Sequence, residues 1–288
     1  MRKFAHTELV LNAKKQVYHL GVSSKDLSTK IILVGDQERV ALVSEQFDSI
    51  EFKSNHREFF CHTGLYKNKR ISVLSTGIGT DNIDIVVNEL DAAFNINLET
   101  REEKIDQTKL ELIRIGTCGL LQADIPIHSY ILSEYALGLD NVGHFYTLNY
   151  TDQEEKLLKS IQDCALFPEH VIPYLKKSST DFLNKFETEH TIKGITVTSS
   201  GFYGPQGRAL RLPTYTLDLN EKLQRFKHNE HRFLNFEMES SALFALGTSL
   251  GHSCATICLG IANRPAKKFS SDYSSHMTAL IQHVLERL

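Results

Sequence analysis

Six short apolar runs punctuate the chain, and each is followed by glycine or by small polar residues. The runs cover residues 31–34, 71–74, 112–115, 130–132, 194–197 and 255–259. Runs of this length, separated by segments with helical spacing, are typical of the strands of an α/β sheet. Ligands of α/β folds bind beyond the carboxyl ends of the strands. We therefore expect the polar residues that follow the runs to gather at one edge of the molecule.

Three further segments show the features of amphipathic helices. The first follows a loop at residues 75–79, and its apolar positions are Ile83, Val86, Val87, Leu90 and Phe94. Thr151 and Glu154 form a capping-box pattern that predicts the start of the second helix. An apolar stripe from Met277 to Leu288 predicts the last one.

The polar and charged segments suggest how the chain is organised around these elements. Residues 1–16 form a polar N-terminal extension, for which we expect poor order unless a partner holds it. Residues 95–111 are rich in charge without apolar periodicity, which predicts a charged surface insertion or an extended connection. The chain has six prolines and no internal repeat, so residues 17–288 are predicted to form one α/β domain.

Composition narrows the class of protein further. A chain of 288 residues with 41% hydrophobic residues can bury a large core, and a net charge of −3 gives no sign of general nucleic-acid binding. The five cysteines are scattered without metal-ligand spacing, so reduced thiols are expected. The N-terminus lacks the apolar stretch of a signal peptide, and no window reaches the ~18 apolar residues of a membrane span. We predict a cytoplasmic protein.

Two arginines lie where an anion could bind. Gly35 and Asp36 end the first apolar run, and Arg39 follows one helical turn later, which suits a phosphate at a helix start. Arg114 lies inside a strand pattern, where an unpaired guanidinium would be costly. Its partner is either a carboxylate of the protein or an oxyanion ligand. Two arginines at adjacent strand ends favour inorganic phosphate.

Two other segments carry polar groups that could contact an organic substrate. Glu237 and Glu239 open a predicted helix, where acidic residues often only complement the helix dipole. Gln206 and Arg208 follow the fifth apolar run, and together they could bind a flat heterocycle with carbonyls and an imide N–H. By itself this segment could equally be a polar loop. The loop at residues 75–79 lacks the third glycine of a dinucleotide fingerprint, so a nicotinamide site is rejected.

Taken together in order, these segments resemble the nucleoside phosphorylase-I family, and within it the uridine phosphorylases. The resemblance runs from about residue 17 to the C-terminus, interrupted by residues 95–111. Its motifs are His19-Leu20-Gly21, Gly35-Asp36 with Arg39, Ser54 to Phe59, Ser75 to Gly79, Arg114 to Thr117, Phe202-Tyr203 with Gln206 and Arg208, Glu237 to Ser240, and Asn263-Arg264. The resemblance implies a single α/β domain with a central mixed, partly barrel-like β-sheet flanked by helices.

The family resemblance also implies a role for each matching residue. Arg208, Gln206, Glu239 and Arg114 are the expected catalytic residues. The phosphate ligands are Gly35, Arg39, Arg114 and Thr117, with Arg57 from a neighbouring subunit. The ribose contacts are Met238, Glu239, Thr117 and a neighbour's His19, and the base contacts are Phe202, Gln206, Arg208 and Arg264. Glu58 matches a residue that helps some relatives hold a monovalent cation, which makes K⁺ a candidate at a dimer interface; no other metal and no cofactor is implied.

This sequence departs from the family pattern at three places. Cys118 stands where the bacterial uridine phosphorylases have threonine, so one hydroxyl near the sugar and phosphate is missing. Gln37 replaces the proline that usually follows Gly-Asp, and Gly204-Pro205 reverses the family order of the base loop.

The implied function is phosphorolysis of uridine to uracil and ribose 1-phosphate. One alternative is a purine nucleoside phosphorylase or a nucleosidase, although Asn263 cannot supply the acid that these relatives place at the base. A catalytically silent nucleoside-binding subunit is the non-enzyme alternative. The expected assembly is a homodimer with shared sites, and the hexamer of bacterial relatives stays open.

Overall fold

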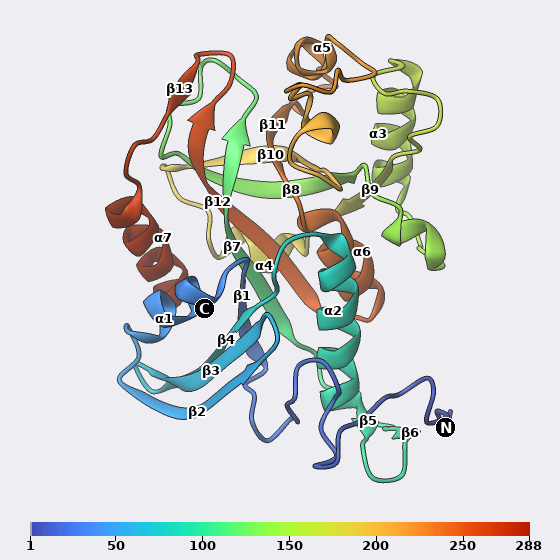
Figure 1. Cartoon of the computed structure of the whole chain (residues 1–288), viewed down its shortest axis with the longest axis vertical. Helices are drawn as coiled ribbons and strands as arrows, with labels where there is room; N and C mark the ends of the chain where they lie inside the picture. Colours follow the sequence, from blue (N-terminus) through green and yellow to red (C-terminus); the bar gives the residue numbers. More distant parts are fainter. Residues whose placement is uncertain (1) are drawn as a thin grey trace.

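The computed structural model describes residues 2–288, and one large mixed sheet runs through it (Figure 1). Its strands are β1 (Lys30–Val34), β2 (Ser49–His56), β3 (Phe59–Tyr66), β4 (Lys69–Ser75), β7 (Glu111–Leu120), β8 (Tyr130–Gly138), β9 (Tyr174–Lys177), β10 (Thr191–Thr198), β11 (Phe233–Glu237), β12 (Ser253–Asn263) and β13 (Lys268–Phe269). The six predicted strands are confirmed as β1, β4, β7, β8, β10 and β12.

Part of the sheet closes on itself. β7 runs parallel to β1 and β12 and antiparallel to β11. β8 pairs with β12 and β10, and β10 pairs with β11. Strands β7, β12, β8, β10 and β11 therefore form a ring, from which β1, β4, β3 and β2 extend as an open sheet. This is the mixed, partly barrel-like sheet that the family resemblance implies.

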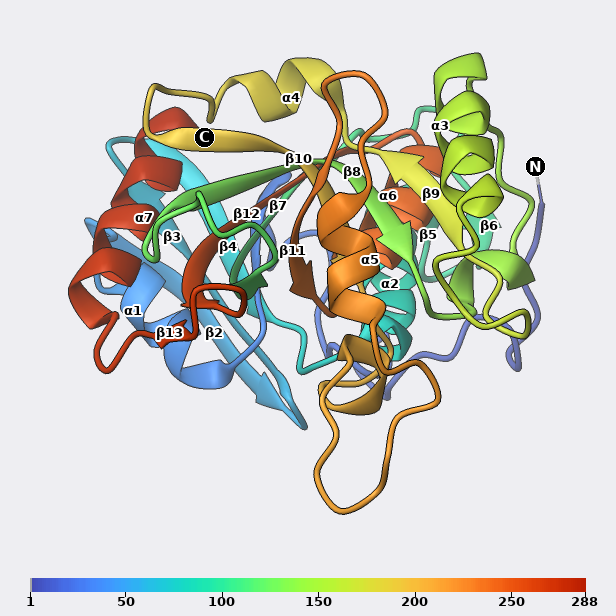
Figure 2. The ribbon, with the colours of Figure 1, turned by 90° about the horizontal axis from the view of Figure 1, so that it is seen from above.

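Helices cover the sheet on several sides (Figures 1 and 2). They are α1 (Gln37–Ser44), α2 (Thr80–Asn95), α3 (Asp152–Asp163), α4 (Thr180–Asn184), α5 (Leu219–Arg225), α6 (Ser240–Ser249) and α7 (Ser274–Arg287), with short 3₁₀ turns at Val142–Phe145 and Gly204–Gln206. The three predicted helices are confirmed as α2, α3 and α7, and α3 begins with the predicted capping box of Thr151 and Glu154.

The apolar pattern of β1 explains why helices pack on both of its faces. Successive side chains of a strand point to opposite faces. Ile31 and Leu33 belong to the hydrophobic core shared with α2 and α6, whereas Ile32 and Val34 belong to the core shared with α1 and α7. A strand buried on both faces is expected to be apolar, as the buried residues 31–34 of β1 are. The polar residues that follow it are therefore set at the edge of a rigid layer.

The charged segment 95–111 and the N-terminal extension hold each other. β5 (Ile96–Asn97) and β6 (Glu102–Glu103) form a small hairpin within the segment. The amide of Phe4 donates to the carbonyl of Arg101 at 2.9 Å, and the buried guanidinium of Arg101 donates to the carbonyl of Leu9. Hydrogen bonds within the chain thus connect the two segments, which form the lobe beside the N-terminus in Figure 1.

The connection 207–218, between the second 3₁₀ turn and α5, projects from the body of the molecule (Figure 2). Its apolar side chains Leu210, Leu212, Tyr215 and Leu217 are largely exposed. Within residues 2–288, no helix combines the length and the apolar character needed to cross a membrane.

Candidate active site

A cleft of about 310 Å³ opens where β1, β7, β10, β11 and β12 present their polar ends. Nine of the predicted site residues line it: Gly35, Arg39, Arg114, Thr117, Phe202, Gln206, Arg208, Met238 and Glu239. These residues come from segments that are far apart in the sequence, from Gly35 to Glu239. The expectation that polar residues after the apolar runs gather at one edge is therefore confirmed for five of the six runs. It is wrong for the run 130–132, because Ser133 and Glu134 lie within β8 and Glu134 lines a different pocket.

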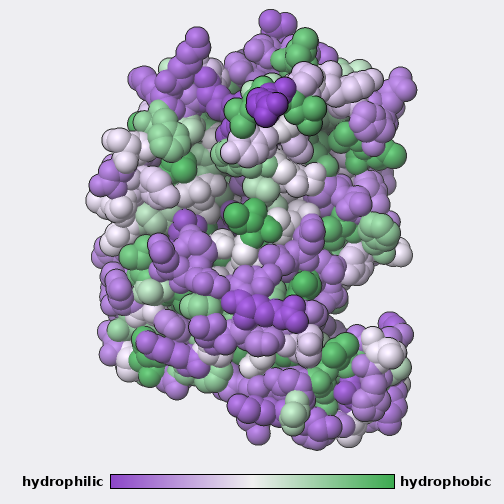
Figure 3. Space-filling model, in the orientation of Figure 1, coloured by the Kyte–Doolittle hydropathy of each residue, from purple (hydrophilic) through white to green (hydrophobic). Residues whose placement is uncertain are grey.

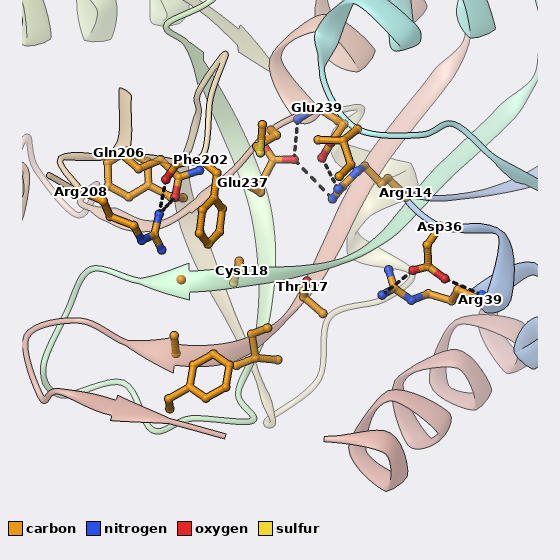
Figure 4. Close-up of a pocket in the computed structure, with 18 residues that line it drawn as sticks. Asp36, Arg39, Arg114, Thr117, Cys118, Phe202, Gln206, Arg208, Glu237 and Glu239 are labelled. Carbon is orange, nitrogen blue, oxygen red and sulfur yellow. Dashed lines mark hydrogen bonds and ion pairs between the residues drawn. The ribbon is translucent and has the colours of Figure 1, made fainter. Parts of the chain in front are cut away.

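The cleft has three groups of polar side chains, which Figure 4 shows in sequence from one end to the other. Asp36 and Arg39 lie at one end, Arg114 with Glu237 and Glu239 in the middle, and Gln206 with Arg208 beside Phe202 at the far end. Thr117 and Cys118 lie on β7 between these groups. An elongated substrate could contact all three groups at once.

Arg114 is buried on β7 and paired with two carboxylates. Its Nη1 lies 3.3 Å from Oε2 of Glu237, and its Nη2 pairs with Oε2 of Glu239. The guanidinium folds back over Gly116, where a Cβ atom would lie only 2.1 Å from Nη1. Side chains two residues apart on a strand share a face, so only glycine leaves this space free. Of the two partners left open by the sequence, the structure shows the protein carboxylates.

Glu237 at the end of β11 is held by hydrogen bonds to the start of α6. Its carboxylate accepts from the hydroxyl of Thr198 at 2.5 Å, from the amide of Glu239 at 3.0 Å and from both the amide and the hydroxyl of Ser240. A carboxylate at a helix N-terminus also complements the helix dipole. Glu237 therefore fixes the backbone that carries Glu239.

Glu239 has a different environment, because its partners are fewer. One oxygen pairs with Arg114, and the other accepts from the amide of Gly79 at 2.9 Å. Burial raises the pKa of Glu239, and the neighbouring carboxylate of Glu237 acts in the same direction, against the charge of Arg114. The two carboxylates in turn raise the pKa of Arg114 despite its burial. One cation thus faces two acids, and this shortage of positive charge favours the protonated form of Glu239.

At one end of the cleft, Arg39 is also paired within the protein. Its Nη2 lies 2.9 Å from Oδ2 of Asp36, and the other carboxylate oxygen of Asp36 accepts from the Arg39 amide at 2.7 Å. Asp36 is therefore the N-cap of α1, with Gly35 directly before it. Backbone N–H groups at a helix start and a guanidinium are suitable ligands for an oxyanion.

At the other end, Gln206 and Arg208 act as one unit. The Arg208 guanidinium donates to the carbonyl of Phe202 at 2.6 Å and to the side-chain oxygen of Gln206, and it lies 4.0 Å from the centre of the Phe202 ring. Gln206 is buried, whereas Phe202 is exposed to the cleft. The pair presents N–H donors next to an aromatic face, which suits a planar base with carbonyl oxygens.

Cys118 lines the cleft on β7, close to Thr117. Its thiol is buried, and burial raises its pKa well above the ordinary value, with a further contribution from Cys258. The thiol therefore stays protonated and offers no negative charge to the cleft.

Four predicted site residues lie outside the cleft of the same chain. His19 and Arg57 are close together on the surface: Nδ1 of His56 lies 2.7 Å from the carbonyl of His19, and Arg57 lies 5.7 Å from the ring centre of Tyr18. Arg57 has a positive φ of 58°, which turns the chain sharply between β2 and β3.

The other two contact backbone rather than the cleft. Arg264 donates to the carbonyls of Gln206 and Gly207 and so braces the loop that carries Gln206. Burial, together with the charge of Arg208, lowers the pKa of Arg264 to about 10. The half-buried Glu58 offers its backbone carbonyl to the hydroxyl of Ser75.

Several cleft residues were not singled out in the sequence. Ile78, Ile261 and Phe269 line the cleft as apolar side chains, for which no polar motif gives a signal. Gly79 lies in the loop that fails as a dinucleotide fingerprint, yet its amide binds Glu239. The backbone of Gly79 has a φ of 101°, a conformation that favours glycine. The glycine itself is therefore the one sign in the sequence that this position is constrained.

With the geometry established, comparison with known proteins decides the family. Residues 29–286 match the phosphorylase superfamily. The chain belongs to this superfamily. Among superfamily members, a uridine phosphorylase of Thermococcus kodakarensis is 28% identical over 272 residues, which are 93% of this chain and 85% of that protein. A DeoD-type purine nucleoside phosphorylase of Oceanobacillus iheyensis is 26% identical over 243 residues, 83% of this chain and 84% of that protein.

A solved structure of the phosphorylase superfamily supports the assignment. The nucleoside phosphorylase of Trypanosoma brucei, whose crystal structure is described as showing uridine phosphorylase activity, matches with a TM-score of 0.90 at 27% identity. The match covers 98% of this chain and 99% of that one. The nucleoside phosphorylase fold expected from the resemblance is thereby confirmed.

The contrast between the two glutamates predicts different effects on stability when each is replaced by glutamine. Glu237→Gln should lower the free energy of unfolding by about 2 kcal/mol, since the carboxylate loses charge-assisted hydrogen bonds at the start of α6. Glu239→Gln should leave it unchanged or raise it, because Arg114 keeps Glu237 as a partner. Urea unfolding of both variants beside the wild type measures this difference.

The pH dependence follows from the raised pKa of Glu239. The folded state holds the Glu239 proton more tightly than the unfolded state, so wild-type stability falls as pH rises above the unfolded pKa. Any advantage of Glu239→Gln should therefore be larger at about pH 8 than at about pH 5. An advantage of Glu239→Gln over the wild type that is smaller at about pH 8 than at about pH 5 would contradict this account.

Proposed function

We propose that this protein is a pentosyltransferase that cleaves uridine with inorganic phosphate and releases uracil and ribose 1-phosphate in pyrimidine nucleoside salvage. The observation that carries the proposal is the order of groups along one cleft: an oxyanion end at Arg39, a central carboxylate at Glu239, and the amide–guanidinium pair of Gln206 and Arg208. Phosphate, ribose and base follow one another in the same order in the reacting complex. The similarity to uridine phosphorylases supports it.

The chemistry explains why these residue types suit the reaction. Phosphorolysis passes through a ribosyl cation-like state while negative charge grows on the departing base. Arg208 and Gln206 stabilise that charge at the uracil carbonyl oxygens, and Glu239 accepts hydrogen bonds from the ribose hydroxyls beside Met238. Gly35, Arg39, Arg114 and Thr117 hold phosphate below the ribose so that the two reactants meet in the right geometry.

A purine substrate is the second candidate, because purine nucleoside phosphorylases are among the similar proteins. The purine reaction requires an acid at the base, and the corresponding residue here is Asn263. Its amide is buried and donates to the carbonyls of Gln122 at 2.9 Å and Ile125 at 2.7 Å. The Asn263 amide thus has a structural role and supplies no acid to a base, which favours a pyrimidine nucleoside as the substrate.

The proposed assembly is a homodimer in which His19 and Arg57 complete the partner's cleft. Both residues lie outside the cleft of their own chain and within one surface patch with Tyr18 and His56. Both side chains could therefore enter the cleft of a single neighbouring subunit. Two-fold symmetry would use the same patch twice. The hexamer of bacterial relatives stays an open alternative to the dimer. K⁺ is the candidate cation near Glu58, and the proposed location is cytoplasmic.

The first test is the phosphate requirement. Uracil release from uridine should need phosphate and should yield ribose 1-phosphate, because two arginines of the cleft and Arg57 of the partner are assigned to the anion. Release is measured by chromatography with phosphate removed enzymatically and then restored, over a panel of uridine, thymidine, inosine and adenosine. Equal rates without phosphate would show a hydrolase, and faster cleavage of inosine or adenosine would favour the purine candidate.

Shared sites predict complementation between inactive variants. Arg57→Ala and Glu239→Ala should each be nearly inactive alone. In a mixed dimer, the cleft of the Arg57→Ala subunit has its own Glu239 and receives Arg57 from the other subunit, so activity should return. Mixing Arg114→Ala with Glu239→Ala is the matched control, because both residues belong to one cleft and no mixed dimer restores it. Mixed dimers that form but stay inactive in the first pair would refute the shared site.

A further inference from the structure

Glu89 on α2 holds the segment that carries His19. Its carboxylate accepts from the backbone amide of His19 at 3.0 Å and from the amide of Leu20 at 2.8 Å. One of its oxygens also lies 2.6 Å from Nδ1 of the His19 ring. The Glu89 side chain is 15% exposed and that of His19 is 33% exposed. Three donors of one turn thus converge on a single, mostly buried carboxylate.

This arrangement determines which ring nitrogen of His19 carries the proton. An ionised carboxylate only accepts hydrogen bonds, so Nδ1 must be the protonated nitrogen. In the neutral ring, Nε2 is then an acceptor. No group among residues 2–288 is hydrogen-bonded to Nε2. The ring therefore presents an acceptor that is free to meet a donor from outside the subunit.

His19 and Glu89 line a groove of about 580 Å³ that is separate from the cleft of the same chain. The groove lies between α2 and the N-terminal lobe, where the molecule is visibly indented (Figure 3). α2 belongs to the hydrophobic core through Ile83, Val86 and Leu90, so Glu89 is mounted on a rigid element. A side chain anchored in this way is positioned before any partner arrives.

We propose that Glu89 is a positioning residue, which fixes His19 as a hydrogen-bond acceptor for the ribose 5′-hydroxyl in the partner's cleft. This inference rests on the proposed function, in which a neighbour's His19 reaches the 5′ end of the sugar. It adds a specificity: the site prefers nucleosides whose 5′ group donates a hydrogen bond. A nucleoside without a 5′ donor leaves Nε2 unpaired and should therefore be a poorer substrate.

The test compares uridine with 5′-deoxyuridine, which lacks only the 5′-hydroxyl. Wild-type protein should favour uridine in kcat/KM by roughly fivefold to tenfold, the value of about one hydrogen bond. Glu89→Gln keeps the size of the side chain but replaces an acceptor by an NH₂ group that faces N–H donors. It should lower kcat/KM for uridine by a similar factor and leave 5′-deoxyuridine unchanged. Glu99→Gln, which removes an exposed carboxylate elsewhere, is the matched control and should change neither.

His19→Ala separates failure of the inference from failure of the proposed function. If His19→Ala keeps the preference for uridine, the proposed role of His19 is wrong. If His19→Ala loses the preference while Glu89→Gln keeps it, or if Glu89→Gln slows both substrates equally, the role of Glu89 is overturned. The double variant should be no worse than His19→Ala alone, as expected for two residues acting through one contact.

A spectroscopic measurement on the unaltered protein covers the case in which a variant fails to fold. Nitrogen NMR of the histidine rings, with His19 assigned in a separate sample, reports which ring nitrogen is protonated. The proposal requires the Nδ1–H tautomer for the neutral His19 ring. A predominant Nε2–H tautomer would overturn it.

Discussion

A buried guanidinium must be paired, and this requirement on Arg114 organises the site. The side chain can lie across β7 only because Gly116 leaves room for it. Its two carboxylate partners come from the end of β11 and the residue before α6, so the ion pairs join a strand to the strand–helix junction beside it. Glu237 completes the junction by accepting hydrogen bonds from the start of α6. The ion pairs of one buried cation thus connect β7 to β11 and fix the position of Glu239.

The same interaction sets the electrostatics of the cleft. Arg39 and Arg114, the two cations assigned to phosphate, are both paired with carboxylates of the protein, Asp36 and Glu239. Because Glu237 and Glu239 share one arginine, the middle of the cleft has excess negative charge whenever Glu239 is ionised. In the proposed complex, a phosphate dianion is opposed by the ionised Glu239 as well as attracted by Arg114. In the proposed reaction, ribose hydroxyls that donate to Glu239 offset part of this opposition.

Much of the fold follows from the sequence, because buried strands and amphipathic helices carry their patterns locally. The apolar run of β1 and the capping box at Thr151 are examples. β2 was not predicted, because six of its eight residues are exposed and its sequence contains no continuous apolar run. The ring of strands was implied by resemblance alone, since pairing of β7 with β11 and β12 depends on contacts distant in sequence. The contact between Glu89 and His19 could not be predicted from the sequence either, because the two residues are 70 positions apart.

The central claim, that Glu239 and phosphate compete for the charge of Arg114, is tested most directly by calorimetric titration of inorganic phosphate into nucleoside-free protein. Glu239→Gln removes the opposing charge, so phosphate should bind this variant roughly tenfold more tightly than the wild type, a gain of about 1.4 kcal/mol. Arg114→Ala should bind more weakly than either. Phosphate affinity in Glu239→Gln that equals or falls below that of the wild type would contradict the account.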